Sequence, residues 1–353
     1  MALTKVSTGV VDMSQDTGGL IIPKGTTAQQ PTCTAANLGS IRENTTKNKV
    51  EVCTANAGTP TWQFLEEAGT SFTPLTVDYL VVAGGGAGGH SYGASGSGGG
   101  AGEFLYKTSQ ALTTGSPGYS VIVGSGSLAV TGSGQLPDYA PNGGDSTFNL
   151  DVTNGGAGGS NSGAYNPGAS GGSGSGGVLG IVGGTSVKTA GGLGNNGGYG
   201  SVTANAYGSG GGGGALTAGA NGSSSVGGNG GDGETNSITG TPVVYSAGGG
   251  GGRYITYSAN AQGGSGGIGG NPISGTPTTP TNYGCGGAGG SYAPGTIAQQ
   301  GGNASSGVVI LRYPSAYDIN FQTGVGFISS TATLSATSEK VTTITAGSGT
   351  ITF

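Results

Sequence analysis

Glycine is the residue that most limits how this chain can fold. Residues 81–302 contain 73 of the 85 glycines in a chain of 353 residues. Glycine loses more backbone freedom on folding than any other residue, and a segment with so few apolar side chains builds little hydrophobic core. This segment is therefore ordered mainly by backbone hydrogen bonds, or it is a flexible linker.

Short apolar runs between the glycine blocks favour an ordered structure over a linker. These runs are predicted to be β-strands, and they are Asp78–Ala83, Glu103–Tyr106, Tyr119–Val123, Pro242–Tyr245 and Gly307–Tyr313. Leu80–Ala83 and Val308–Leu311 are apolar throughout, which is typical of strands that are buried on both faces. The glycine blocks recur at irregular spacing, which excludes collagen and repeats of fixed length.

We expect the glycine blocks to form extended segments with three residues per turn that pack side by side. Such a segment leaves its N–H and C=O groups without partners inside the segment, so these groups bond to neighbouring segments. Weak Cα–H to oxygen contacts add to this packing. The inward position recurs every third residue and must be glycine, whereas Ser, Asn, Ala or Tyr can occupy the outward positions.

The regions that flank the glycine-rich segment are predicted to form short strands and almost no helix. Ile41–Asn44 and Lys49–Cys53 form a hairpin, and Trp62–Leu65 is a third strand. Near the C-terminus, Lys340–Thr345 and Thr350–Phe353 flank Ala346–Gly349, a pattern that predicts a second hairpin.

These patterns together predict an all-β protein in three parts. Residues 1–76 form an N-terminal β-hairpin module for attachment or oligomerisation. Residues 77–314 form a glycine-rich domain of short strands and polyglycine-type extended segments. Residues 315–353 form a short C-terminal β segment.

Charge and motif content argue against several classes of function. Only 7% of the residues are charged, the formal net charge is −5, and no basic run exists to bind nucleic acid. No window approaches the roughly 18 apolar residues of a membrane span, so we expect no membrane insertion. His90 is the single histidine and has no nearby Asp, which argues against a nucleophilic triad. We expect no enzyme activity, no cofactor and no metal.

Three cysteines are too few for a disulfide scaffold, and they lack the spacing of a zinc site. Cys33 and Cys53 could meet across a hairpin. Two cysteines without a disulfide are the interpretation we favour, and Cys285 lies far from both in the sequence.

Tyrosine is the most informative side chain of the glycine-rich segment. Five tyrosines fall on predicted strands and are expected in the core, namely Tyr79, Tyr106, Tyr119, Tyr245 and Tyr313. A second group lies among Gly, Ser and Asn, and it comprises Tyr92, Tyr165, Tyr199, Tyr207, Tyr254, Tyr257, Tyr283 and Tyr292. Tyr, Ser, Gly and Asn are the residues of antibody binding loops. With His90, the second group is predicted to contact a receptor, unless these rings only cover gaps between glycine segments.

The order of several motifs resembles the glycine-rich domain of phage tail-fibre and adhesin-like proteins. The motifs are Val77-Asp-Tyr-Leu-Val-Val-Ala-Gly-Gly-Gly86, Gly98-Gly-Gly-Ala-Gly-Glu-Phe-Leu-Tyr106, Tyr119-Ser-Val-Ile-Val-Gly124, Asn142-Gly-Gly-Asp-Ser-Thr-Phe148 and Ser306-Gly-Val-Val-Ile-Leu-Arg-Tyr-Pro314. Ile22–Pro31 with Gly39–Asn44 is also similar to a β-hairpin module of fibre proteins. Gln30 and Glu43 depart from that module, in which many members have Arg and an aromatic residue.

The resemblance implies a phage tail fibre or fibre-tip adhesin, located in the virion and made in the host cytoplasm. It implies a homotrimer whose N-terminal region contacts other virion proteins. The Tyr-bearing loops would recognise a host surface glycan or an outer-membrane protein. A structural virion protein without a receptor, such as a head decoration or fibre shaft, is the alternative. A bacterial surface or ice-binding protein is disfavoured because no ordered threonine array is present.

Overall fold

The computed structural model describes residues 22–56, 59–64, 75–114, 118–131, 137–162, 166–202, 207–224, 226–254, 279–292 and 300–353. Across these residues the chain is all-β, as the sequence predicts, and its helical content is two 3₁₀ turns, Thr27–Gln29 and Ala35–Asn37. The chain divides into two compact units, Met1–Pro74 and Leu75–Phe353. Each unit is described by itself.

The first unit is a four-stranded sheet in the order β1-β2-β3-β4. Its strands are β1 (Lys24–Gly25), β2 (Ile41–Asn44), β3 (Lys49–Asn56) and β4 (Thr59–Phe64). The predicted hairpin of β2 and β3 is confirmed, with Ile41 opposite Val52 and Asn44 opposite Lys49. The predicted third strand starts earlier, at Thr59, and Leu65 lies outside the described residues.

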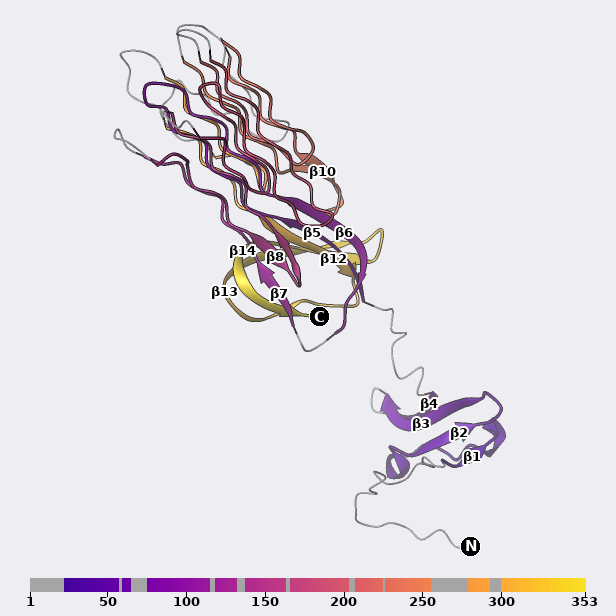
Figure 1. Cartoon of the computed structure of the whole chain (residues 1–353). Helices are drawn as coiled ribbons and strands as arrows, with labels where there is room; N and C mark the ends of the chain where they lie inside the picture. Colours follow the sequence, from indigo (N-terminus) through magenta and orange to yellow (C-terminus); the bar gives the residue numbers. More distant parts are fainter. Residues whose placement is uncertain are drawn as a thin grey trace, which may run out of the picture. The chain divides into compact units, whose positions relative to one another are not determined.

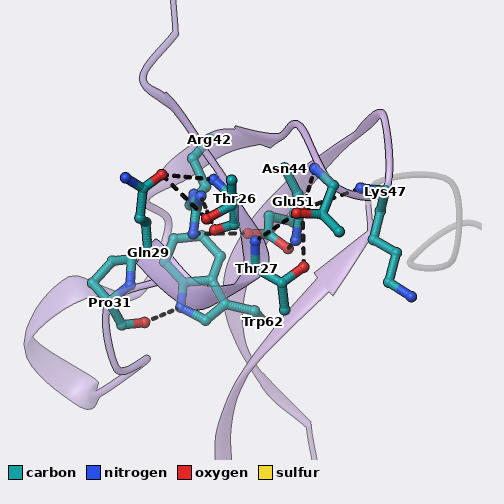
Figure 2. A network of polar contacts seen from close by, with 10 residues as sticks. Thr26, Thr27, Gln29, Pro31, Arg42, Asn44, Lys47, Glu51 and Trp62 are labelled. Carbon is teal, nitrogen blue, oxygen red and sulfur yellow. Dashed lines mark hydrogen bonds and ion pairs between the residues drawn. The ribbon is translucent and has the colours of Figure 1, made fainter.

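Polar side chains fill the interior of this first unit (Figure 2). Arg42, Asn44 and Glu51 are all buried. The Arg42 guanidinium lies 3.3 Å from a Glu51 carboxylate oxygen, and the Asn44 amide donates to the other oxygen at 3.1 Å. A second Arg42 nitrogen donates to the carbonyl of Thr26 at 3.0 Å. Through Arg42, these bonds connect the segment after β1 to the β2–β3 hairpin.

A disulfide joins Cys33 to Cys53, with 5.4 Å between their Cα atoms. The expectation that these cysteines stay outside a disulfide is therefore wrong. The segment before β2 is held against β3 and β4, since Gly39 donates to the carbonyl of Cys53 and the Trp62 indole donates to the carbonyl of Pro31. The sequence separation of 20 residues corresponds to a stabilisation of about 3 kcal/mol.

The second unit is built on an eight-stranded sheet in the order β6-β5-β12-β14-β7-β8-β9, with β13 paired to β14. The strands of this sheet are β5 (Thr76–Val82), β6 (Phe104–Ala111), β7 (Tyr119–Ile122), β8 (Ser146–Phe148), β9 (Asp151–Thr153), β12 (Val308–Pro314), β13 (Asn320–Leu334) and β14 (Glu339–Thr352). A separate two-stranded sheet pairs β10 (Glu234–Asn236) with β11 (Val243–Tyr245).

The C-terminal hairpin differs from the sequence prediction. Ala346–Gly349 is not a turn, because β14 runs through it as one strand, and the turn to β13 lies at residues 335–338. Gly347 has a φ of 104°, and a Cβ atom there would lie 2.7 Å from the backbone of Phe327. The glycines of this segment therefore permit an irregularity in the strand pairing and do not reverse the chain.

Strands β5 and β12 carry the hydrophobic core on both of their faces, as their continuous apolar runs predict. Val81 and Leu311 belong to one buried cluster, and Leu80 and Ile310 belong to a cluster on the opposite face. Four of the five strand tyrosines are buried as expected, namely Tyr79, Tyr119, Tyr245 and Tyr313. The fifth, Tyr106, is 36% exposed because it lies on β6, at the edge of the sheet.

The glycine-rich segments continue from this sheet as a bundle of extended chains that run side by side (Figure 1). Residues 84–89 show how they are joined. Each donates its backbone N–H to a neighbouring segment, and the same neighbour recurs after three residues. The acceptors, in order, are the carbonyls of Gly144, Ser305, Gly100, Pro141, Gly302 and Ser97. The predicted period of three residues is therefore confirmed.

The bundle requires glycine at more positions than every third one. A Cβ atom added to Gly84, Gly85 or Gly86 would lie 2.1 Å from the carbonyl oxygen of a different neighbour. These neighbours are Ser125, Cys285 and Ala157. A central segment is thus enclosed on all sides, so consecutive positions must be glycine, which corrects the expectation of one inward position per turn.

Gly86→Ala is predicted to destabilise the second unit by about 3 kcal/mol, because overpacking against rigid backbone costs this much. Gly144→Ala is the matched control, since its Cβ atom would meet its nearest neighbour at 3.0 Å. We expect a clearly smaller loss for the control. Thermal unfolding followed by calorimetry measures both, and equal losses would show that the close approach at Gly86 is not what restricts that position.

Candidate functional site

Several of the candidate receptor contacts lie at the end of the bundle that is away from the sheet. His90 follows the last residue of β5 by eight positions, and Tyr254 follows the last residue of β11 by nine. Extended backbone with three residues per turn rises by about 3.1 Å per residue, so this end lies roughly 25 Å beyond the strands. Figure 1 shows the segments running in that direction. We call it the distal end.

Three of the predicted tyrosines meet at the distal end. Tyr254 donates its backbone N–H to the carbonyl of Tyr207 at 2.8 Å, and Tyr254 forms a parallel bridge with Tyr292. The ring centroids of Tyr207 and Tyr254 are 5.6 Å apart in an edge-on contact, and those of Tyr254 and Tyr292 are also 5.6 Å apart. All three side chains are partly exposed. We call these residues the tyrosine cluster.

Buried serines join the segments that carry the tyrosine cluster. The hydroxyls of Ser95 and Ser209 are 2.7 Å apart, and the Ser91 hydroxyl donates to the carbonyl of Ser291 at 2.7 Å. The Ser291 hydroxyl in turn accepts the backbone N–H of Arg253 at 3.1 Å. Because each hydroxyl both spans two segments and satisfies a buried polar group, the serines hold the distal end in register.

Arg253 is the one distal residue whose charge the described part of the chain leaves unneutralised. It is 4% exposed, and its Nε and Nη1 atoms are buried without a hydrogen-bond acceptor among the described residues. Burial lowers the pKa of Arg253. Removing a cation from water costs several kcal/mol unless an anion or acceptors replace the lost hydration.

Sequence reasoning did not select Arg253 as a site residue. One feature of the sequence could have identified it: Arg253 is the single Lys or Arg between Lys188 and Arg312.

Other predicted contacts lie apart from the tyrosine cluster. His90 is predicted from the sequence to contact a receptor, but it is only 2% exposed, and its backbone N–H donates to the Asn161 side chain at 2.6 Å. Tyr92 and Tyr199 are 58% and 41% exposed. His90 is therefore buried, whereas these two tyrosines face solvent.

The remaining three candidates do not contribute to the described distal end. Tyr283 packs against the hydrophobic cluster that contains Tyr245, and its carbonyl accepts the backbone N–H of Ser246, next to the strands. Tyr165 and Tyr257 lie outside the described residues.

The first unit has a groove of its own, with a volume of about 410 Å³. It is lined by Pro23, Lys24, Gly25, Gln29, Pro31, Asn37, Ser40, Ile41, Arg42 and Trp62. Trp62 is anchored by its bond to the carbonyl of Pro31, and Ile41 remains exposed on β2. This groove presents aromatic and aliphatic surface beside the cations Lys24 and Arg42.

Neither a metal centre nor a membrane span is found in the part of the chain that the structure describes. No group of three or more His, Cys, Asp or Glu side chains is placed to hold a metal ion there. No helix in that part is long and apolar enough to cross a membrane.

The glycine-rich bundle is the feature that relates this chain to known proteins. A family described as the glycine-rich domain matches residues 54–314. The match covers most of the chain, which therefore belongs to the glycine-rich domain family. No curated protein matches the sequence.

Proposed function

We propose that this protein is a phage tail fibre or fibre-tip adhesin that recognises the host cell surface with its distal end. The observation that carries the proposal is the tyrosine cluster, which stands at the end of a hydrogen-bonded glycine frame. Tyrosine offers large amphipathic contacts at low cost in side-chain entropy. The proposal includes no reaction, no cofactor and no metal.

The frame supports this role because it places binding groups rigidly and far from the core. Backbone bonds hold Tyr254 to Tyr207 and Tyr292 to Arg253. Groups that are already ordered lose less entropy when a ligand binds. The ligand class that we propose is a host surface glycan, with an outer-membrane protein as the second candidate.

We propose that the first unit attaches the protein to other virion components. This unit is compact by itself, and its groove contains Trp62, the single tryptophan of the chain. Its disulfide fits a protein that acts outside the cell, since disulfides persist in oxidising surroundings. The mature protein would reside in the virion after synthesis in the host cytoplasm.

Tyr254→Ala is predicted to reduce binding to host cells at least tenfold while the protein stays folded. The central ring contacts both neighbouring rings, and removal of an aromatic anchor from a binding surface commonly costs 2 kcal/mol or more. Fluorescently labelled protein is first screened against bacterial strains, and the variant is then measured on a strain that the wild type binds. Tyr106→Ala is the control, because Tyr106 is exposed on β6 at the other end of the unit.

Two results would contradict the proposal. If the wild-type protein binds no strain, the structural virion role without a receptor is favoured. If Tyr254→Ala binds normally and alterations in residues 1–80 abolish binding, recognition belongs to the first unit.

We propose further that three copies assemble through the first unit. The second unit builds both hydrophobic clusters within one chain, so it does not need partners to form a core. The first unit buries mainly polar side chains and leaves Leu38 and Ile41 exposed, and oligomeric contacts would cover them. Light scattering is predicted to give three times the chain mass of 33.3 kDa. A mass of 33.3 kDa at micromolar concentration would exclude the trimer.

A further inference from the structure

We propose that Arg253 forms a subsite for the carboxylate of an acidic saccharide beside the tyrosine cluster. The inference rests on the proposed function, because it names the chemical class of the receptor that the distal end would bind. It identifies a residue and a ligand charge that the tyrosines alone do not imply.

The backbone of Arg253 lies among the three residues of the tyrosine cluster. Tyr254 follows it in the sequence, and Tyr292 donates its backbone N–H to the carbonyl of Arg253 at 2.9 Å. Gly208, next to Tyr207, forms an antiparallel bridge with Arg253. The buried guanidinium therefore belongs to a residue whose backbone is bonded to the segments that carry all three rings.

The charge of Arg253 has no counterpart in the segments around it. The sequence has no Asp or Glu between Glu234 and Asp318, a range that includes both the segment of Arg253 and that of Ser291. Residues 89–97, 207–211 and 226–231, which also bond to this segment, lack a carboxylate. Asp232 comes next after Gly231, whose carbonyl accepts the N–H of Gly248, five residues before Arg253. Two buried guanidinium nitrogens consequently keep N–H groups without an acceptor among the described residues.

A carboxylate matches the buried N–H groups of Arg253 better than a phosphate does. A guanidinium forms short, directional bonds with a carboxylate, and the two opposite single charges cancel. A phosphate monoester carries about −1.5 to −2 charges at neutral pH. Because Arg253 is the sole cation between Lys188 and Arg312, a phosphate would leave uncompensated negative charge in a buried place.

A saccharide fits the surroundings of the charge better than a peptide segment does. Partly exposed tyrosine rings offer flat apolar faces to the C–H face of a sugar ring, and their hydroxyls bond to the hydroxyls at its rim. Most of the buried residues in the described segments beside Arg253 are serines and glycines, including Ser95, Ser209 and Ser291, and these offer little apolar surface to the aliphatic side chains of a protein loop. The tyrosine cluster and Arg253 would thus bind one acidic sugar residue through stacking and charge pairing.

The test compares two sugars that differ in one carboxylate. Binding of methyl β-D-glucuronide and methyl β-D-glucoside to the full chain is measured by saturation-transfer NMR and calorimetry. We expect the wild type to prefer the glucuronide by about tenfold or more, since hydrogen bonds to charged groups are worth that much. Arg253→Gln should abolish the preference. Lys188→Gln is the control, because Lys188 is an exposed cation of the same unit, and it should keep the preference.

Thermal unfolding separates a binding role from a structural one. Without a ligand, Arg253→Gln should unfold at the same temperature as the wild type or at a higher one, because the variant no longer buries a charge. A lower unfolding temperature would show that Arg253 stabilises the fold, and it would overturn the subsite.

Two further results would overturn the proposal: the wild type shows no preference for the glucuronide, or the preference survives in Arg253→Gln. A third would be binding of N-acetyl-aspartate N-methylamide as tight as that of the glucuronide, because this would favour a protein carboxylate as the ligand. These results are distinguishable from failure of the proposed function. A glucuronide preference without binding to any bacterial strain keeps the subsite and removes the adhesin role. Cell binding without that preference removes the subsite alone.

Discussion

The close approach of glycine backbones is the interaction on which the rest of this structure depends. Consecutive residues Gly98, Gly99 and Gly100 donate to three different segments, at Gly210, Gly287 and Ala157. Each segment is thus surrounded by partners for its N–H and C=O groups, an arrangement that side chains would prevent at most of these positions. Strands β5 and β12 supply the hydrophobic anchor, and the bundle extends that order without an apolar core of its own.

The close packing of glycine backbones also determines where large and charged side chains can lie. Most of the buried side chains inside the bundle are Ala and Ser, and larger ones such as Val178 and His90 are few. The tyrosine cluster and Arg253 occupy the distal end, where the segments stop enclosing one another. Three aromatic side chains and one cation are thereby placed close together at an end of the bundle whose interior holds mostly small residues.

Much of the architecture could be predicted from the sequence, because apolar runs marked the buried strands and glycine blocks implied a period of three residues. The prediction failed for features that depend on contacts between residues far apart in the sequence. Gly347 and Gly349 suggest a turn locally, yet pairing with β13 and β7 keeps β14 continuous. The Cys33–Cys53 disulfide depends on how the segment around Pro31 folds onto β4. The burial of His90 and Arg253 depends on segments distant in sequence, so neither could be placed from local composition.

Amide hydrogen exchange tests most directly whether a hydrogen-bonded glycine frame supports the distal end. Residues 84–89 donate to neighbouring segments, so their amides should exchange as slowly as those of β5, since exchange then requires opening of the bundle. NMR or mass spectrometry on the full chain measures both regions in the same sample. Exchange of residues 84–89 at the rate of an unfolded chain, with β5 still protected, would contradict this structure of the bundle and the rigid presentation built on it.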